Sequence, residues 1–173
     1  LINSSPISLK RVRKIYENNA VKDKKIDLIK GDLRSEKDLN NVFLRSKEEG
    51  KPIRAVIHFA GLKSVSESIK NPLMYWDNNL ISTINLLKIM NKNECFNLVF
   101  SSSATIYSDD RNNLFSENSP IKPINPYGYT KLTVENILRD IFNASNKKLK
   151  FASLRYFNPI GAHPSGLIGE NPM

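Results

Sequence analysis

Two short apolar runs constrain the fold of this chain more than any other feature of its sequence. They cover residues 54–59 and 96–101, and each is nearly continuous instead of alternating with polar residues. Such runs are typical of parallel strands that are buried on both faces. Small or hydroxyl-bearing residues follow them, at 60–61 and at 102–103. The sequence therefore predicts a parallel sheet with residues suited to ligand binding where its strands end.

The segments around these runs have helical periodicity. Apolar residues recur three or four positions apart at Leu73, Trp76, Leu80, Ile84 and Leu87. This spacing predicts the buried stripe of a long helix, and an Asn-Pro pair at 71–72 gives it an N-cap and a first residue. The chain alternates between predicted helices (6–19, 35–49, from 72, from 126) and predicted strands (26–29, 54–59, 96–101, 150–154). This order predicts a doubly wound α/β fold with a parallel sheet.

Composition excludes several other classes of protein. The 173 residues suit one domain, and no apolar run has the length of a membrane span or the form of a signal peptide. Cys95 is the single cysteine, and the two histidines are far apart, so we expect no internal disulfide and no metal site. These features fit the reducing cytoplasm best.

The net charge of +9 raises the alternative of a nucleic-acid partner. The lysines are spread along the chain, however, and the densest cluster, at 22–25, has no aromatic residues among it. We therefore expect no nucleic-acid partner and no membrane partner.

One constellation points to chemistry. Ser103 ends a predicted strand, and Tyr127 and Lys131 lie four residues apart at the start of a predicted helix, so both point to one side. An ammonium favours the phenolate and should lower the tyrosine pKa from its usual value of about 10. The alternative is an exposed helix in which Lys131 pairs with Glu135. The serine-bearing strand favours proton transfer, because ligands of open α/β sheets bind beyond the carboxyl ends of strands.

Seven segments carry a resemblance to a known family. They are 31–34 (Gly-Asp-Leu-Arg), 58–63 (His-Phe-Ala-Gly-Leu-Lys), 77–79 (Asp-Asn-Asn), 100–105 (Phe-Ser-Ser-Ser-Ala-Thr), 126–131 (Pro-Tyr-Gly-Tyr-Thr-Lys), 155–159 (Arg-Tyr-Phe-Asn-Pro) and 161–166 (Gly-Ala-His-Pro-Ser-Gly). Through them the chain resembles the extended short-chain dehydrogenases/reductases, and among these the 4-epimerases of UDP-hexoses. The resemblance covers essentially the whole chain and implies a Rossmann-like fold that binds NAD.

The resemblance also implies a role for each matching residue. Tyr127 would be the catalytic base, Lys131 would hold the nicotinamide ribose and tune Tyr127, and Ser103 would bond the reacting oxygen. Cofactor contacts are implied for Asn3, Ser4, Asp32, Leu33, Phe59, Ala60, Gly61, Lys63, Asn78, Tyr127, Lys131 and Phe157. Substrate contacts are implied for Ser103, Tyr127 and Asn158. Plainer alternatives are a turn residue at Asp32, a solvated Lys63, a helix-surface amide at Asn78 and a core histidine at His58.

The implied activity is inversion of C4 of a UDP-hexose, UDP-glucose or UDP-galactose, by transient hydride transfer to bound NAD. A UDP-sugar would be the substrate, and the full-length protein would pair as a homodimer through the helices that begin at 72 and 126. Other sugars, UDP-GlcNAc/GalNAc or a UDP-pentose, stay open. A 4,6-dehydratase is less favoured, because that enzyme carries Thr-Asp-Glu where this chain has Ser103-Ala104-Thr105. A non-catalytic nucleotide-binding relative is less favoured because the proton-transfer residues are all present.

Two departures from the family pattern matter. Ser108 stands where a glycine usually follows the tyrosine, and we expect a local adjustment there. The family's opening strand, glycine-rich turn, helix and second strand have no counterpart, and neither has its C-terminal substrate domain. We therefore expect residues 1–173 to be an internal fragment, a partial NAD-binding domain whose substrate-binding region starts at about 158. Alone it would fold poorly and be inactive, with the 26–29 strand separated from the rest of the sheet.

Overall fold

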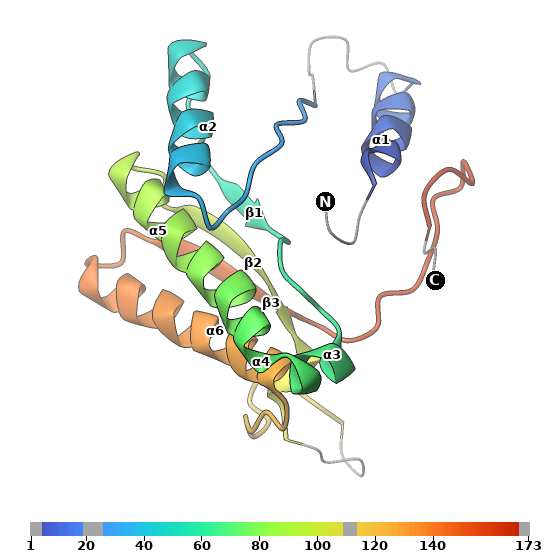
Figure 1. Ribbon diagram of the computed structural model, residues 1–173, viewed down its shortest axis with the longest axis vertical. Helices are drawn as coiled ribbons and strands as arrows, with labels where there is room; N and C mark the ends of the chain where they lie inside the picture. Colours follow the sequence, from blue (N-terminus) through green and yellow to red (C-terminus); the bar gives the residue numbers. More distant parts are fainter. Residues whose placement is uncertain (1–4, 19–25, 109–113, 170–173) are drawn as a thin grey trace. The chain divides into compact units, whose positions relative to one another are not determined.

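The computed structural model describes residues 5–18, 26–108 and 114–169. The chain forms two compact units: residues 31–157, and the end segments 1–30 with 158–173. The larger unit contains the sheet and all but one of the helices described (Figure 1).

The sheet has three parallel strands in the order β1-β2-β3. They are β1 (Val56–His58), β2 (Asn97–Ser103) and β3 (Lys150–Tyr156). The register pairs His58 with Phe100 and Ser103 with Tyr156, so the carboxyl ends of β2 and β3 lie at the same edge. The predicted parallel α/β fold is therefore confirmed, and β2 is its central strand.

The helices of this unit are α2 (Glu36–Glu48), α3 (Val65–Lys70), α4 (Pro72–Tyr75), the π-helical turn η1 (Trp76–Ile81), α5 (Ser82–Lys92), the 3-10 turn η2 (Ala104–Ile106) and α6 (Pro126–Ala144). Helices α2 and α6 have side-chain N-caps. The Ser35 hydroxyl accepts a hydrogen bond from the Asp38 amide, and the Asn125 side chain accepts one from Gly128. Ser108 has no positive φ, and its amide bonds the Pro120 carbonyl.

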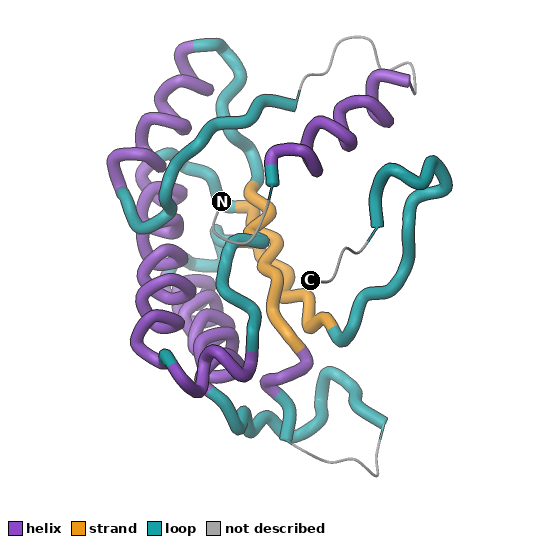
Figure 2. Tube along the Cα trace, turned by 45° about the vertical axis from the view of Figure 1, so that its right-hand side comes forward, coloured by secondary structure: helices purple, strands orange, loops and turns teal. Residues whose placement is uncertain are grey.

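One face of the sheet packs on helices (Figure 2). Leu98 and Phe100 of β2 are buried in a core shared with α2, α5 and α6. Neighbouring residues of paired strands point alternately to the two faces, and on the other face Ile57 is 63% exposed. The expectation that β1 is buried on both faces is therefore wrong. The described helices of residues 31–157 cover only the face that contains Leu98 and Phe100, and the face of Ile57 stays exposed.

The stripe predicted for the long helix is only partly right. Leu87 is buried and Leu80 packs on the core, but Leu73 is 82% exposed, and the buried positions also include Tyr75, Asn79, Thr83 and Met90. In the π-helical turn each hydrogen bond joins residues five apart instead of four, which changes which side chains face inward. The prediction placed only apolar residues inside, whereas here the first half of the stripe is polar.

The unit of end segments contains α1 (Pro6–Asn18), close to the predicted helix. Residues 26–30 form no strand, although one was predicted at 26–29. A strand needs a neighbouring ladder, and Leu28 and Ile29 are nearly half exposed. Residues 158–169 form turns in which the His163 ring bonds the Ser165 hydroxyl at 2.9 Å.

Candidate active site

The three residues predicted to be catalytic come from two adjoining elements and are all buried. Ser103 is the last residue of β2, and Tyr127 and Lys131 occupy the first two turns of α6. Their exposed fractions are 6%, 9% and 5%. The Ser103 side chain is a hydrogen-bond partner of the Tyr127 phenol. The Lys131 ammonium lies 5.7 Å from the centre of the Tyr127 ring. The structure therefore brings the predicted trio together at the carboxyl end of the central strand.

Lys131 makes its hydrogen bond with the backbone. Its Nζ donates to the carbonyl oxygen of Ser101 at 2.7 Å and lies 4.9 Å from the centre of the Phe100 ring. The alternative in which Lys131 pairs with Glu135 on an exposed helix is excluded, because Glu135 is itself buried and bonds Ser102 and Arg155.

Burial controls the charge state of the site. The pKa of Tyr127 is raised, because burial of the phenol outweighs the opposing hydrogen bond with Ser103. The pKa of Lys131 is lowered to about 8, because burial penalises its ammonium. The expectation that Lys131 lowers the pKa of Tyr127 in this arrangement is wrong. The lysine charge is directed to a carbonyl oxygen and is itself weakened by desolvation.

The loop after β1 contains the next predicted group: Phe59, Ala60, Gly61 and Lys63, all of them exposed. A Cβ on Gly61 would lie 3.1 Å from the Asn79 side-chain oxygen and 3.8 Å from Lys131 Nζ. Any larger residue would therefore occupy the space in front of the buried lysine. Glycine at 61 therefore lets this exposed loop lie close to Asn79 and Lys131, at the sheet edge where ligands of open α/β folds bind.

Asn79 is a site residue to which the sequence assigned no role. It is 4% exposed, its Oδ1 accepts from the Leu62 amide at 2.8 Å, and its Nδ2 donates to the Leu62 carbonyl at 3.0 Å. Nδ2 also lies 3.2 Å from the Thr130 hydroxyl, next to Lys131. Asn79 therefore fastens the Gly61 loop to α6. The detectable signal was polar residues four apart, at 75, 79 and 83, within a helix.

His58 is a core histidine, as predicted. It is 3% exposed and its Nε2 lies 2.9 Å from the Thr83 hydroxyl. Its pKa is lowered to about 4, by burial and by the charge of Lys131. His58 is therefore neutral and supports the polar stripe of α4, η1 and α5.

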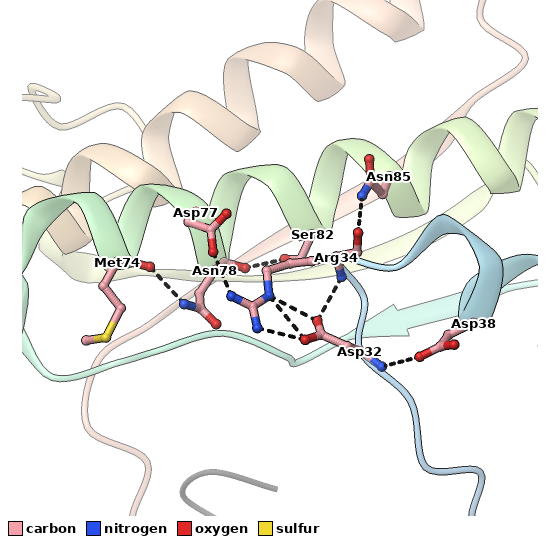
Figure 3. Close-up of polar contacts among 8 residues, drawn as sticks. All are labelled: Asp32, Arg34, Asp38, Met74, Asp77, Asn78, Ser82 and Asn85. Atoms are coloured by element: carbon pink, nitrogen blue, oxygen red, sulfur yellow. Dashed lines mark hydrogen bonds and ion pairs between the residues drawn. The ribbon is translucent and has the colours of Figure 1, made fainter.

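The turn before α2 contains Asp32 and Leu33, two residues with implied cofactor roles (Figure 3). Leu33 is half-buried and packs on the core, whereas the Asp32 carboxylate is exposed and forms an ion pair with Arg34 at 2.7 Å. The Arg34 hydrogen bonds lower the pKa of Asp32. The Asn78 side chain is nearby on η1 and donates to the Met74 carbonyl at 2.9 Å.

A second buried network, not predicted from the sequence, supports the strand that ends in Ser103. Glu135 of α6 accepts from the Ser102 hydroxyl at 2.5 Å and from Arg155 at 2.8 Å. Arg155 also donates to the Tyr107 hydroxyl at 3.0 Å, and the Tyr107 ring stacks on Phe157, which is 60% exposed. This network joins α6, β2 and β3 next to the predicted trio.

The remaining predicted residues are placed as follows. Asn158 is exposed and belongs to the unit of end segments. Asn3 and Ser4 lie outside the described residues. Among the described residues, no group of His, Cys, Asp and Glu could hold a metal ion. None of the helices described is long and apolar enough to cross a membrane.

Comparison with known families decides where the chain belongs. Residues 8–170 match the family described as NAD dependent epimerase/dehydratase. The chain belongs to the NAD dependent epimerase/dehydratase family. The resemblance deduced from its seven motif segments is thereby confirmed.

Individual members of the family are similar to this chain over nearly its whole length. UDP-glucose 4-epimerase 1 of Oryza sativa subsp. japonica is 48% identical over 172 residues, which cover 99% of this chain and 46% of the rice protein. The UDP-glucose 4-epimerase of Dictyostelium discoideum is 49% identical over 99% of this chain and 46% of its own length. The chain spans about half the length of the curated relatives it matches.

Solved structures of the family share this fold. The UDP-glucose 4-epimerase of Bifidobacterium longum, solved in complex with NAD+ and UDP, matches with a TM-score of 0.86 and 44% identity. The match covers 98% of this chain and 47% of that one. The arrangement of strands and helices is therefore that of an epimerase family member, Rossmann-like, as predicted.

Proposed function

We propose that this chain contributes the NAD-binding and catalytic portion of a UDP-hexose 4-epimerase, with UDP-glucose and UDP-galactose as substrates. The observation that carries the proposal is the joint burial of Ser103, Tyr127 and Lys131 beside the open Gly61 loop. A proton-transfer set at a ligand-binding sheet edge suits a reaction in which a hydroxyl is oxidised and then reduced again.

NAD, when bound, would supply reversible hydride transfer at C4 of the sugar, which is the chemistry that inversion at this carbon needs. The residues proposed to hold NAD are Asp32, Leu33, Phe59, Ala60, Gly61, Lys63, Asn78, Tyr127, Lys131 and Phe157, together with Asn3 and Ser4. The Gly61 loop fits this role because a side chain there would meet Asn79 and Lys131.

Tyr127 is proposed to take the proton from the sugar O4 as C4 loses its hydride, and to return it in the second half of the reaction. Ser103, a hydrogen-bond partner of the phenol, is proposed to bond the same oxygen. Because burial raises the pKa of Tyr127, positive charge has to favour its phenolate for the first step. Lys131 is not proposed to supply that charge, because its ammonium is directed to the Ser101 carbonyl; it is proposed to hold the nicotinamide ribose.

The sequence after β2 argues for this reaction over a 4,6-dehydration. Residues 104 and 105 are alanine and threonine, and the Thr105 hydroxyl donates to Ser103 at 3.0 Å. The positions where a dehydratase carries its acidic pair therefore have no carboxylate. The Ser103 hydroxyl is instead oriented by the hydrogen bond from Thr105 in the following turn, η2.

The identity of the sugar is the finer part of the proposal. A Pisum sativum relative, 46% identical, is named a bifunctional UDP-glucose and UDP-xylose 4-epimerase. A Campylobacter jejuni structure with 32% identity is titled a UDP-Glc/GlcNAc 4-epimerase. We propose UDP-hexose as the substrate class. We also propose that the substrate-binding region starts at about 158 and that Asn158 contacts the substrate. We also propose that the full-length protein is a cytoplasmic homodimer.

The test is Tyr127→Phe in the full-length protein, with Tyr129→Phe as the matched control. Tyr129 lies in the same helical turn and is 46% exposed. Y127F should lower turnover of UDP-glucose by about 10²–10⁴-fold, because the acid-base group is lost, while NAD stays bound. Y129F should behave as wild type. Near-normal turnover by Y127F would remove this residue from the mechanism.

A further inference from the structure

The π-helical turn η1 lies between two parts of the proposed cofactor site. Its successive residues Asp77, Asn78 and Asn79 are all polar. Asn79 bonds Leu62 in the Gly61 loop, whereas Asp77 pairs with Arg34 in the turn before α2. π-helical turns occur frequently at functional sites. This one connects the loop beside Lys131 to the turn that contains Asp32.

Arg34 makes the second of these connections with its whole guanidinium group (Figure 3). Nη1 donates to Asp77 at 2.6 Å, and Nη2 donates to Asp32 at 2.7 Å. Nε lies 3.2 Å from both carboxylate oxygens of Asp32, and the Arg34 amide donates to one of them at 2.9 Å. Each Asp32 oxygen therefore accepts from Arg34, which fixes the plane of the carboxylate.

The fold of this turn is held by other bonds. The Asp32 amide donates to Asp38 at 3.0 Å, and Asn85, which is 8% exposed, donates to the Arg34 carbonyl at 2.9 Å. The side chains in the ion pairs are 37% exposed for Arg34, 51% for Asp32 and 52% for Asp77. Ion pairs this exposed add little to stability. The bridge from Arg34 to Asp32 and Asp77 therefore contributes more to the orientation of the Asp32 carboxylate than to the stability of the fold.

We propose that Arg34 is a positioning residue for NAD: by bridging Asp32 and Asp77 it holds the Asp32 carboxylate in the orientation that accepts a hydrogen bond from the adenine amino group. The inference rests on the proposed function, in which Asp32 and Asn78, next to Asp77, contact NAD, and on the family resemblance, which implies that Asp32 lies at the adenine. Pre-set orientation matters because a hydrogen bond to a ligand is lost when its acceptor is free to rotate away.

The test compares NAD with nicotinamide hypoxanthine dinucleotide, which lacks the adenine amino group, in the full-length protein after NAD has been removed. Calorimetry gives both affinities for wild type, Arg34→Met and Arg34→Lys. Wild type should prefer NAD by about tenfold, as expected for one hydrogen bond to a charged acceptor. Both variants should lose most of this preference. Methionine has no donor for Asp32 or Asp77, and the single ammonium of lysine cannot bind both Asp32 oxygens and Asp77.

The matched control is Lys88→Met. Lys88 pairs with Glu36 at 2.9 Å, joins α5 to α2, and is 61% exposed, so K88M removes a comparable ion pair outside the proposed site. It should keep the wild-type preference. R34M should melt, without ligand, within a few degrees of wild type; if R34M does not fold, R34K decides.

The outcomes separate the two proposals. If wild type fails to bind NAD, the proposed function fails. If wild type binds NAD but shows no preference, or if R34K and a folded R34M keep the preference, the positioning role of Arg34 is overturned. Equal loss of affinity for both dinucleotides, accompanied by a large drop in melting temperature, would also overturn it in favour of a purely structural role.

Discussion

The backbone of Gly128 lies against the carbonyl oxygen of Thr105. A Cβ placed on Gly128 would stand 2.6 Å from that oxygen and 3.1 Å from Pro123 Cβ. Real Cβ atoms do not approach so closely, so the first turn of α6 can rest on η2 only with glycine here. This contact sets the distance between Tyr127, which precedes Gly128, and Ser103, which precedes η2.

Gly128→Ala should therefore displace α6 from η2. We expect a loss of stability of about 1–3 kcal/mol from overpacking, and turnover lower by tenfold or more because Tyr127 moves with the helix. Urea unfolding and epimerisation assays in the full-length protein measure the two effects. Asn136→Ala, at an exposed position of α6, is the control. Wild-type activity in G128A would show that α6 accommodates the methyl group.

Lys131→Met should change how stability depends on pH. The unfolded lysine keeps its proton up to a pKa of 10.5, whereas the folded one loses it at about 8, so folding becomes more favourable as pH rises between these values. The change in pKa corresponds to about 3 kcal/mol. In the ligand-free full-length protein, wild-type stability should gain more than K131M between pH 8 and 10. Parallel curves for the two proteins would contradict a buried, destabilised ammonium.

His58→Gln should protect the fold against acid. The unfolded imidazole binds a proton with a pKa of 6.5 and the folded one at about 4, so His58 removes stability as pH falls through this window. The glutamine amide can still bond Thr83, so the melting temperature of H58Q should fall less than that of wild type between pH 6.5 and 4. His163→Gln is the control, because His163 is exposed and should leave the wild-type slope unchanged. If the melting temperature of H58Q falls with pH as steeply as that of wild type, His58 is not a buried neutral histidine.

Glu135→Gln should be far more damaging than a matched change on the surface. Glu135 is 4% exposed and pairs with Arg155, so its neutralisation leaves a mostly buried guanidinium without a counter-charge. Breaking a buried pair from one side typically costs about 3–5 kcal/mol. Glu49→Gln breaks the exposed pair of Arg45 and Glu49 and should cost far less, because solvent screens an exposed ion pair. Chemical denaturation of both variants gives the comparison, and similar losses would exclude a special role for the buried network.

The sequence by itself determined the local features and their order. The caps at Ser35 and Asn125, the parallel strands β1 and β2 and the spacing of Tyr127 and Lys131 depend on residues close in the chain. Periodicity, capping and strand endings are interactions of this short range, so they can be read along the sequence.

Only the tertiary structure decided what depends on burial and on distant partners. The π-helical turn reversed the expected exposure of Leu73 and put Asn79 inside, and 26–30 has no strand partner among the described residues. Burial raised the pKa of Tyr127, against expectation, and the bridge from Arg34 to Asp77 joins residues 43 positions apart. The energy of a charge depends on what surrounds it in space, and linear spacing carries no record of that surrounding.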